Sequence, residues 1–443
     1  MVCNLANFCT YLSNPESTHP RSIWGNAGSC INAGPCLTPP ITCPTGNYVF
    51  SSQADVLGFE SLYGDCTDII LNNIVIGNID TDLYSSISNI SFLENVIGIT
   101  GNLTIKKTNN LSDLTGLNQL NGIGGNFEFS NNNATVNLNG LSGFSTIGGN
   151  IIIDSNTALQ SLFGTSTITE INGKLDIKNN TSLLNLNGLD TVTDISGDIE
   201  VNSNPLLQTL NMNDLEESKN ISIYSNTQLQ NIGLSNLTTV NGNLRIYSNN
   251  NLQHLNGLNS LTTITQGLSI RNNNSLQNLN GLNALSNIVG TLSISNNNSL
   301  SDASGLENIN HEALTYLTIT DNSLLPMCSF PNICTFIIMK PGKSSIYGNH
   351  SQCASLEDVT NNCFAGNCNS FTIWKDNKWS NKKPNLQTRA IIMDEFTVSE
   401  SLEACEMEVY PLGKITVEND NHLIVEGQLI NRANTEDFVV ENE

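Results

Sequence analysis

The sequence has little charge, few basic residues and no long hydrophobic run. Charged residues make up only 13% of its 443 residues, and 17 lysines and arginines stand against 40 acidic residues, for a formal net charge of -23. Without a basic surface the chain cannot replace nucleic-acid counterions or dock on an anionic membrane, so we expect no nucleic-acid partner. Since no segment reaches the roughly eighteen apolar residues of a membrane span, we also expect no direct membrane insertion.

The middle of the chain also lacks cysteine, because none of the 12 lies between Cys66 and Cys328. Clusters at both ends of a regular array indicate disulfide-stabilised caps and an oxidising compartment, and no C-x2-C pair favours zinc. We therefore expect an extracellular or cell-surface location, and the absence of an export signal predicts that this chain is a fragment. The disulfide candidates are Cys3, Cys9, Cys30, Cys36, Cys43, Cys66, Cys328, Cys334, Cys353 and Cys363.

What the sequence does contain is a repeat of about 24 residues between residues 101 and 325. A fixed period in the twenties indicates a solenoid, whose coils bury their apolar residues against one another. In one copy Leu244 and Ile246 alternate with outward residues, as in a short strand, and leucines then follow at every third residue up to Ile264. This spacing predicts a polygonal coil and not a helix. The copies align on Gly101, Gly125, Gly149, Gly173, Gly197, Lys219, Gly242, Gln266, Gly290 and Thr315.

An asparagine follows three residues after the last core residue of each strand, except in the first copy, which has Thr108. Asparagine hydrogen-bonds backbone groups that a turn leaves unpaired, and it tolerates left-handed dihedrals. We therefore expect a stacked column with a structural role. Its members are Asn132, Asn156, Asn180, Asn204, Asn226, Asn249, Asn273, Asn297 and Asn322.

The copy "GNLTI…NNLSDLTGLNQLNGI" and its relatives resemble the leucine-rich repeats of the receptor L-domain type, over about residues 43 to 363. That class occurs in growth-factor receptor ectodomains, fungal wall proteins and secreted proteins of Bacteroidetes. The resemblance implies a mainly β fold, a leucine-rich-repeat parallel β-solenoid with disulfide caps and strands on more than one face. Here two residues separate the asparagine from the next leucine where one is usual, which favours this variety over a horseshoe with outer helices.

The edges of the array predict the domain organisation. Near the start, "CNLANFC…SIWGNAGSC" matches "CSFPNIC…SIYGNHSQC" after the last repeat, so we expect the first segment to close a preceding, missing repeat domain. A capped helix is expected to begin at Ser52 and to be held by a bond from Cys43 to Cys66. The expected units are a preceding cap over 1–38, a linker and N-terminal cap over 39–66, the solenoid over 67–327, a C-terminal cysteine cap over 328–368 and an incomplete second β-rich module over 369–443.

No pattern of residues indicates catalysis. The five histidines have no metal-ligand spacing and are expected at the surface. The stretch "PGKSS" at 341–345 lacks the earlier glycine of a phosphate loop, and the pair Glu216-Glu217 is best explained as a solvated turn. We therefore predict no catalytic residue, no cofactor and no metal.

The outward face of the strands is the remaining candidate for a functional site. Tyr224, Arg245, Tyr247 and Arg271 meet over the sixth to eighth copies, and tyrosine and arginine are favoured at binding sites. We expect a non-catalytic extracellular recognition or adhesion module of a large bacterial surface or secreted protein, with a protein or glycan ligand. The simpler interpretation is that the tyrosines only cover the sheet. The alternatives are a passive spacer, or an accessory module of a secreted hydrolase whose catalytic domain lies elsewhere.

Overall fold

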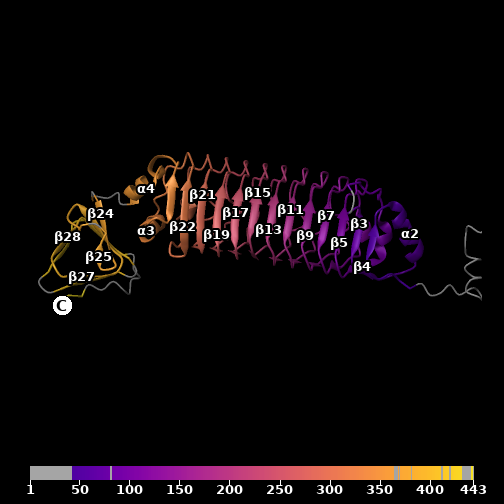
Figure 1. The fold of residues 1–443 in the computed structure, drawn as a ribbon, viewed down its shortest axis with the longest axis horizontal. Coiled ribbons are helices and arrows are strands. Elements are labelled where there is room, and N and C mark those ends of the chain that lie inside the picture. The colour runs from indigo at the N-terminus through magenta and orange to yellow at the C-terminus, as the bar shows by residue number, and fades with distance from the viewer. Residues whose placement is uncertain are drawn as a thin grey trace, which may run out of the picture.

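The structure is a computed structural model, and the predicted preceding cap at 1–38, with Cys3, Cys9, Cys30 and Cys36, lies outside the residues that it describes. It describes residues 42–79, 82–363, 368, 370–380, 382–410, 413–418, 421–431 and 441–442. Within them the chain is mainly β, and two long parallel sheets run along a stack of coils (Figure 1). The prediction of a parallel β-solenoid with strands on more than one face is confirmed.

The larger sheet has 13 strands, and each pairs in parallel with the strand of the next coil. Its strands, in spatial order, are β1 (Tyr48–Phe50), β3 (Ile74–Gly77), β5 (Leu103–Lys106), β7 (Phe127–Ser130), β9 (Ile151–Asp154), β11 (Leu175–Lys178), β13 (Ile199–Asn202), β15 (Ile221–Tyr224), β17 (Asn243–Tyr247), β19 (Gly267–Arg271), β21 (Gly290–Ser295), β22 (Leu314–Thr320) and β23 (Ser344–Tyr347).

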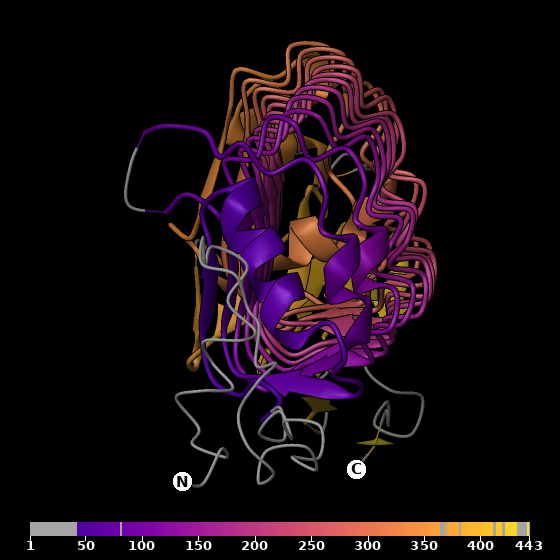
Figure 2. The same ribbon diagram turned by 90° about the vertical axis from the view of Figure 1, so that its right-hand side faces the viewer.

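The smaller sheet has 10 strands, formed by the last residues of each coil. In order they are β2 (Ile69–Leu71), β4 (Val96–Ile99), β6 (Gly122–Ile123), β8 (Thr146–Ile147), β10 (Glu170–Ile171), β12 (Asp194–Ile195), β14 (Glu217–Ser218), β16 (Thr239–Val240), β18 (Thr263–Ile264) and β20 (Asn287–Ile288). Figure 2 looks along the stack, and the coils superimpose as one flattened polygon.

The core lies inside that polygon. Leu244 and Ile246 on β17, and every third residue from Leu252 to Ile264, have no exposed surface. The glycines on which the copies align are needed because the coils lie close together. Most of them have ordinary dihedrals, but a Cβ at Gly242 would lie only 2.6 Å from Oδ1 of Asn220 in the preceding coil.

The N-terminal cap is built on α2 (Gln53–Tyr63). Ser52 caps this helix, and it and Asp55 form the reciprocal bonds of a capping box, as the sequence suggests. A disulfide joins Cys43 to Cys66. The cap also contributes β1 to the larger sheet, so the sheet begins before the predicted solenoid boundary at residue 67.

The C-terminal cap is built on α3 (Pro331–Met339) and α4 (Leu356–Cys363). Disulfides join Cys328 to Cys353 and Cys334 to Cys363. This cap contributes β23, so the sheet also extends past the predicted boundary at residue 327. The short 3-10 helices are η1 (Ser91–Asn95), η2 (Thr115–Leu117), η3 (Ser304–Leu306) and η4 (Ser351–Cys353).

Beyond the cap, short strands pass in turn to three sheets, the arrangement of a three-sided parallel coil. The sequence predicts only alternating strands here. One sheet holds β24 (Ser370–Lys375), β25 (Lys378–Trp379), β26 (Thr388–Ile392), β29 (Glu406–Val409) and β32 (Leu429–Asn431), the next β27 (Glu395–Val398), β30 (Lys414–Val417) and β33 (Glu441–Asn442), and the third β28 (Leu402–Ala404) and β31 (Leu423–Val425). A disulfide outside the predicted set joins Cys368 to Cys405.

Buried polar contacts connect this segment to the C-terminal cap. Nε and Nη2 of Arg389 both donate to Oε2 of Glu406 in the same segment. Nη1 of Arg389 donates to the carbonyl of Cys363 in the cap, at 3.4 Å. The hydroxyls of Tyr410 and Thr335 on α3 lie 3.1 Å apart. The four disulfides of the described residues fit an oxidising environment. Among those residues, no helix combines the length and hydrophobicity needed to span a bilayer.

Candidate functional site

The candidate site lies on the outward face of the larger sheet, where two columns of side chains cross the strands from β5 to β22. One column precedes the last core residue of each strand, and the other follows it. The first column is Thr104, Glu128, Ile152, Asp176, Glu200, Ser222, Arg245, Ser269, Ser293 and Thr318, and the second is Lys106, Ser130, Asp154, Lys178, Asn202, Tyr224, Tyr247, Arg271, Ser295 and Thr320.

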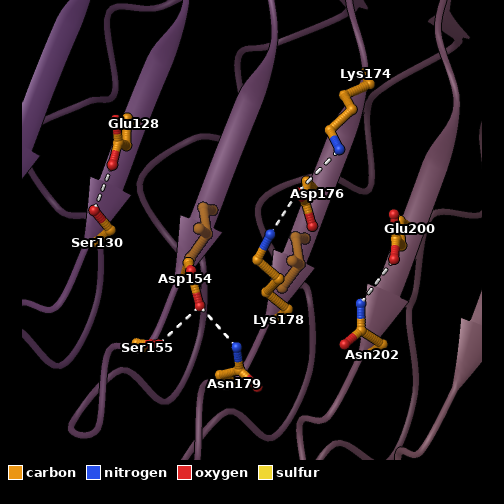
Figure 3. A network of polar contacts seen from close by, with 12 residues as sticks. Glu128, Ser130, Asp154, Ser155, Lys174, Asp176, Lys178, Asn179, Glu200 and Asn202 are labelled. Carbon is orange, nitrogen blue, oxygen red and sulfur yellow. Dashed lines mark hydrogen bonds and ion pairs between the residues drawn. The ribbon is translucent and has the colours of Figure 1, made fainter.

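Lysines pair with two of the four carboxylates at the acidic end of this face, Glu128 and Asp176. Asp176 is only 3% exposed, and its Oδ2 lies 3.0 Å from Nζ of Lys174 and 2.9 Å from Nζ of Lys178. Figure 3 shows the two lysines reaching this carboxylate from both sides. The hydrogen bond to Asp176 raises the pKa of Lys178. Lys106 pairs with Glu128 at 2.9 Å, so lysines hold both carboxylates, although the buried Oδ1 of Asp176 has no hydrogen-bond partner among the described residues.

The other carboxylates of the face are engaged in hydrogen bonds. Asp154 accepts from the Ser155 hydroxyl at 2.8 Å and from Nδ2 of Asn179 at 2.9 Å (Figure 3). Glu200 accepts from Nδ2 of Asn202 at 3.2 Å and from the hydroxyl of Tyr224 at 2.6 Å. The bond from Tyr224 connects the acidic end of the face to its aromatic end.

The structure brings three of the four predicted site residues into one stack. The rings of Tyr224 and Tyr247 lie parallel, with centroids 4.5 Å apart and planes 5° apart, and Cζ of Arg271 lies 4.6 Å from the Tyr247 centroid on the next strand. The parallel register of β15, β17 and β19 places these residues opposite one another. Burial and the hydrogen bond to Glu200 raise the pKa of the Tyr224 phenol. The stack is therefore held in one orientation.

The fourth predicted residue, Arg245, lies beside this stack on β17. It pairs across the strands with Ser222 and Ser269. Among the residues that the structure describes, no carboxylate forms a salt bridge with Arg245 or Arg271. These two arginines are also the exposed members of the two columns, whose other side chains are half-buried or buried.

The predicted asparagine column is a buried hydrogen-bonded ladder. Asn249 is typical: its Oδ1 accepts from the backbone N–H of Asn226 at 3.1 Å, and its Nδ2 donates to the carbonyl of Ile223 at 3.0 Å. The left-handed residue of each turn is the one before the asparagine, such as Ser248 with φ 58°. The ladder closes at Asn349 of the cap, whose Oδ1 accepts from the backbone of Asn322 at 3.0 Å.

A second amide ladder, not predicted from the sequence, lies at the opposite end of several strands. Oδ1 of Asn102 accepts from the backbone N–H of Asn126, and Asn126 in turn accepts from Asn150, both at 2.7 Å. The signal was the asparagine that directly follows several of the aligned glycines. Both ladders are structural, because their side-chain oxygens accept backbone donors of the neighbouring coil.

The structure shows no metal-binding cluster within its described ranges. No three histidines, cysteines or carboxylates there lie close enough to hold a metal ion. His350 and His422 are exposed, but His254 and His311 are half-buried, so the expectation of surface histidines is wrong for these two. Glu216 and Glu217 are exposed, but Glu217 begins β14, so the expectation of a turn is wrong for Glu217, and His19 lies outside the described residues.

Comparisons with known proteins do not identify a family for this chain. No family model matches the chain, and a search of curated proteins finds no match either.

Proposed function

We propose that this chain is a non-catalytic recognition or adhesion module of the receptor L-domain type of leucine-rich repeat, working outside the cell or at its surface. The observation that carries the proposal is the stack of Tyr224, Tyr247 and Arg271, fixed on a flat parallel sheet beside the exposed Arg245. The 24-residue repeat and the capping disulfides support the assignment to this repeat class.

Rigidity is the physical basis of the proposed mechanism. A partner that binds a flexible surface must order it, and each immobilised side chain costs about 0.5 to 1.5 kcal/mol of affinity. Here the hydrogen bond from Tyr224 to Glu200 and the parallel rings already hold the side chains in place. Tyrosine and arginine also supply much of the binding energy at protein interfaces. The solenoid therefore displays an ordered surface that a partner can bind at little further entropic cost.

The test is binding to glycan and protein arrays by the wild type and by a Tyr224→Ala/Tyr247→Ala/Arg271→Ala variant. A Ser293→Ala/Ser295→Ala variant is the matched control, because it truncates outward side chains of the same sheet on β21, the strand next to β19, without removing a member of the stack. We expect the wild type and the control to share ligands that the triple variant does not bind. If all three proteins give the same profile, or none binds, the recognition site is refuted and a passive spacer is the better description.

A further inference from the structure

The charged side chains of the outward face have different surroundings on two groups of strands. From β5 to β13, lysines and hydrogen-bond donors contact the carboxylates, as at Glu128 and at Oδ2 of Asp176, whose buried Oδ1 has no partner among the described residues. On β17 and β19 two positive side chains, Arg245 and Arg271, are exposed with no carboxylate paired to them among the described residues. Two nearby like charges repel one another, and a bound anion relieves that repulsion.

The surroundings leave both guanidinium groups open. Arg245 lies between Ser222 and Ser269, whose short side chains cannot cover it. Arg271 lies with its Cζ 4.6 Å from the centroid of the Tyr247 ring. A guanidinium stacked on an aromatic face keeps its in-plane N–H donors free for a carboxylate, so the ring orients Arg271 without occupying its donors.

The spacing of the two arginines fits an extended peptide. They are diagonal neighbours on adjacent parallel strands, because Arg245 pairs with Ser269, two residues before Arg271. Strand separation and rise place their Cα atoms about 8 Å apart. Carboxylates on alternate residues of an extended peptide lie about 7 Å apart, which the long arginine side chains can match.

Resting on the proposed recognition function, we infer that Arg245 and Arg271 bind an extended acidic segment of a protein partner through carboxylates on alternate residues. A peptide is favoured over an acidic glycan by the ring geometry. A sugar that stacks on tyrosine needs a free ring face, and both faces of Tyr247, the ring nearest the two arginines, are covered, one by Tyr224 and the other by Arg271. The exposed guanidinium groups are the donors that remain.

The experiment measures binding of the whole chain to an alternating Glu-Ser peptide, by calorimetry at low and high salt. A Gln-Ser peptide and polygalacturonate are run beside it. The variants are Arg245→Gln/Arg271→Gln, Arg245→Lys/Arg271→Lys and, as a control for lost charge elsewhere, Lys343→Gln/Lys414→Gln, which changes two exposed lysines. Circular dichroism melts verify that every variant is folded.

We expect the Glu-Ser peptide to bind the wild type and the control, more weakly at high salt because the Debye length shrinks. Each arginine changed to glutamine should weaken binding about fivefold, and the lysine variant should recover only part of it because lysine lacks the planar fork. Equal binding of the Gln-Ser peptide, or no effect of the glutamine variant, overturns the inference. Binding of polygalacturonate alone overturns the choice of a peptide. If the arrays reveal a neutral ligand while the Glu-Ser peptide fails, recognition stands and the carboxylate inference falls.

Discussion

Removing one rung of the buried asparagine ladder should destabilise the solenoid strongly. In the Asn249→Ala variant, the N–H of Asn226 and the carbonyl of Ile223 lose their partners at 3.1 Å and 3.0 Å. Asn249 has no exposed surface, so water cannot replace those bonds. A buried unpaired polar group costs about 1 to 3 kcal/mol, so we expect the free energy of unfolding to fall by about 2 to 6 kcal/mol.

The matched control is Asn250→Ala, which deletes the same group one residue later on the exposed surface. Its Oδ1 accepts only from the exposed Nδ2 of Asn274, at 3.3 Å, so we expect a change within about 0.5 kcal/mol. Urea titrations followed by circular dichroism measure the stability of both variants. The dependence of the free energy of unfolding on urea concentration is compared as well, because repeat arrays can unfold in parts. If the two variants lose the same stability, the argument that the ladder satisfies buried backbone groups is wrong.

The Asn249→Asp variant separates hydrogen bonding from packing. It keeps the acceptor for Asn226 but turns a second oxygen towards the Ile223 carbonyl, so burial and this carbonyl raise the pKa of the introduced carboxyl in the folded protein. Protonation then favours the folded state, and the free energy of unfolding should rise as pH falls through that pKa. A pH-independent loss of stability would show that packing alone decides the effect.

Three further outcomes follow from the charges. The raised pKa of Tyr224 should make this tyrosine ionise after exposed ones in an ultraviolet titration, with stability lost as pH rises above 10.0, and Glu200→Gln should lower that pKa. Burial opposes ionisation of Glu128, but hydrogen bonds from its lysine and serine partners lower its pKa overall. The contribution of Glu128 to stability should therefore be lost as pH falls below 4.5, and the Glu128→Gln variant should lose less stability over the same pH range. Arg389→Met leaves the carboxylate of Glu406 buried without its partner, which should cost about 3 to 5 kcal/mol and expose the C-terminal strands to limited proteolysis.

The repeating part of the fold could be predicted from the sequence because its causes are local and are repeated in every copy. Alternation at Leu244 and Ile246, and the triplet spacing up to Ile264, specify which side chains turn inward whatever lies further along the chain. The N-terminal cap was predictable for the same reason, since the box from Ser52 to Asp55 spans one helical turn. The sheets nevertheless extend beyond the predicted solenoid, because each cap adds a strand by pairing with a neighbouring coil.

The C-terminal strands show where such prediction stops. Their sequence shows alternation, but the assignment of β26, β27 and β28 to three different sheets depends on which later strand each one meets. The bond from Cys368 to Cys405 was missed because its partners lie 37 residues apart, with no repeat to suggest the pairing. The half-burial of His254 likewise depends on neighbouring coils.

At the candidate site, the sequence alone determined that Tyr224, Arg245, Tyr247 and Arg271 face outward on neighbouring coils, because the period and the strand alternation specify both facts. Only the tertiary structure decided that the tyrosines stack and that Arg271 covers one of them. It also decided which partners the nearby carboxylates have, as at Asp176, whose Oδ2 lies between two lysines. Side-chain contacts between coils depend on rotamers and on atoms about 24 residues away in the chain, and no local pattern encodes them.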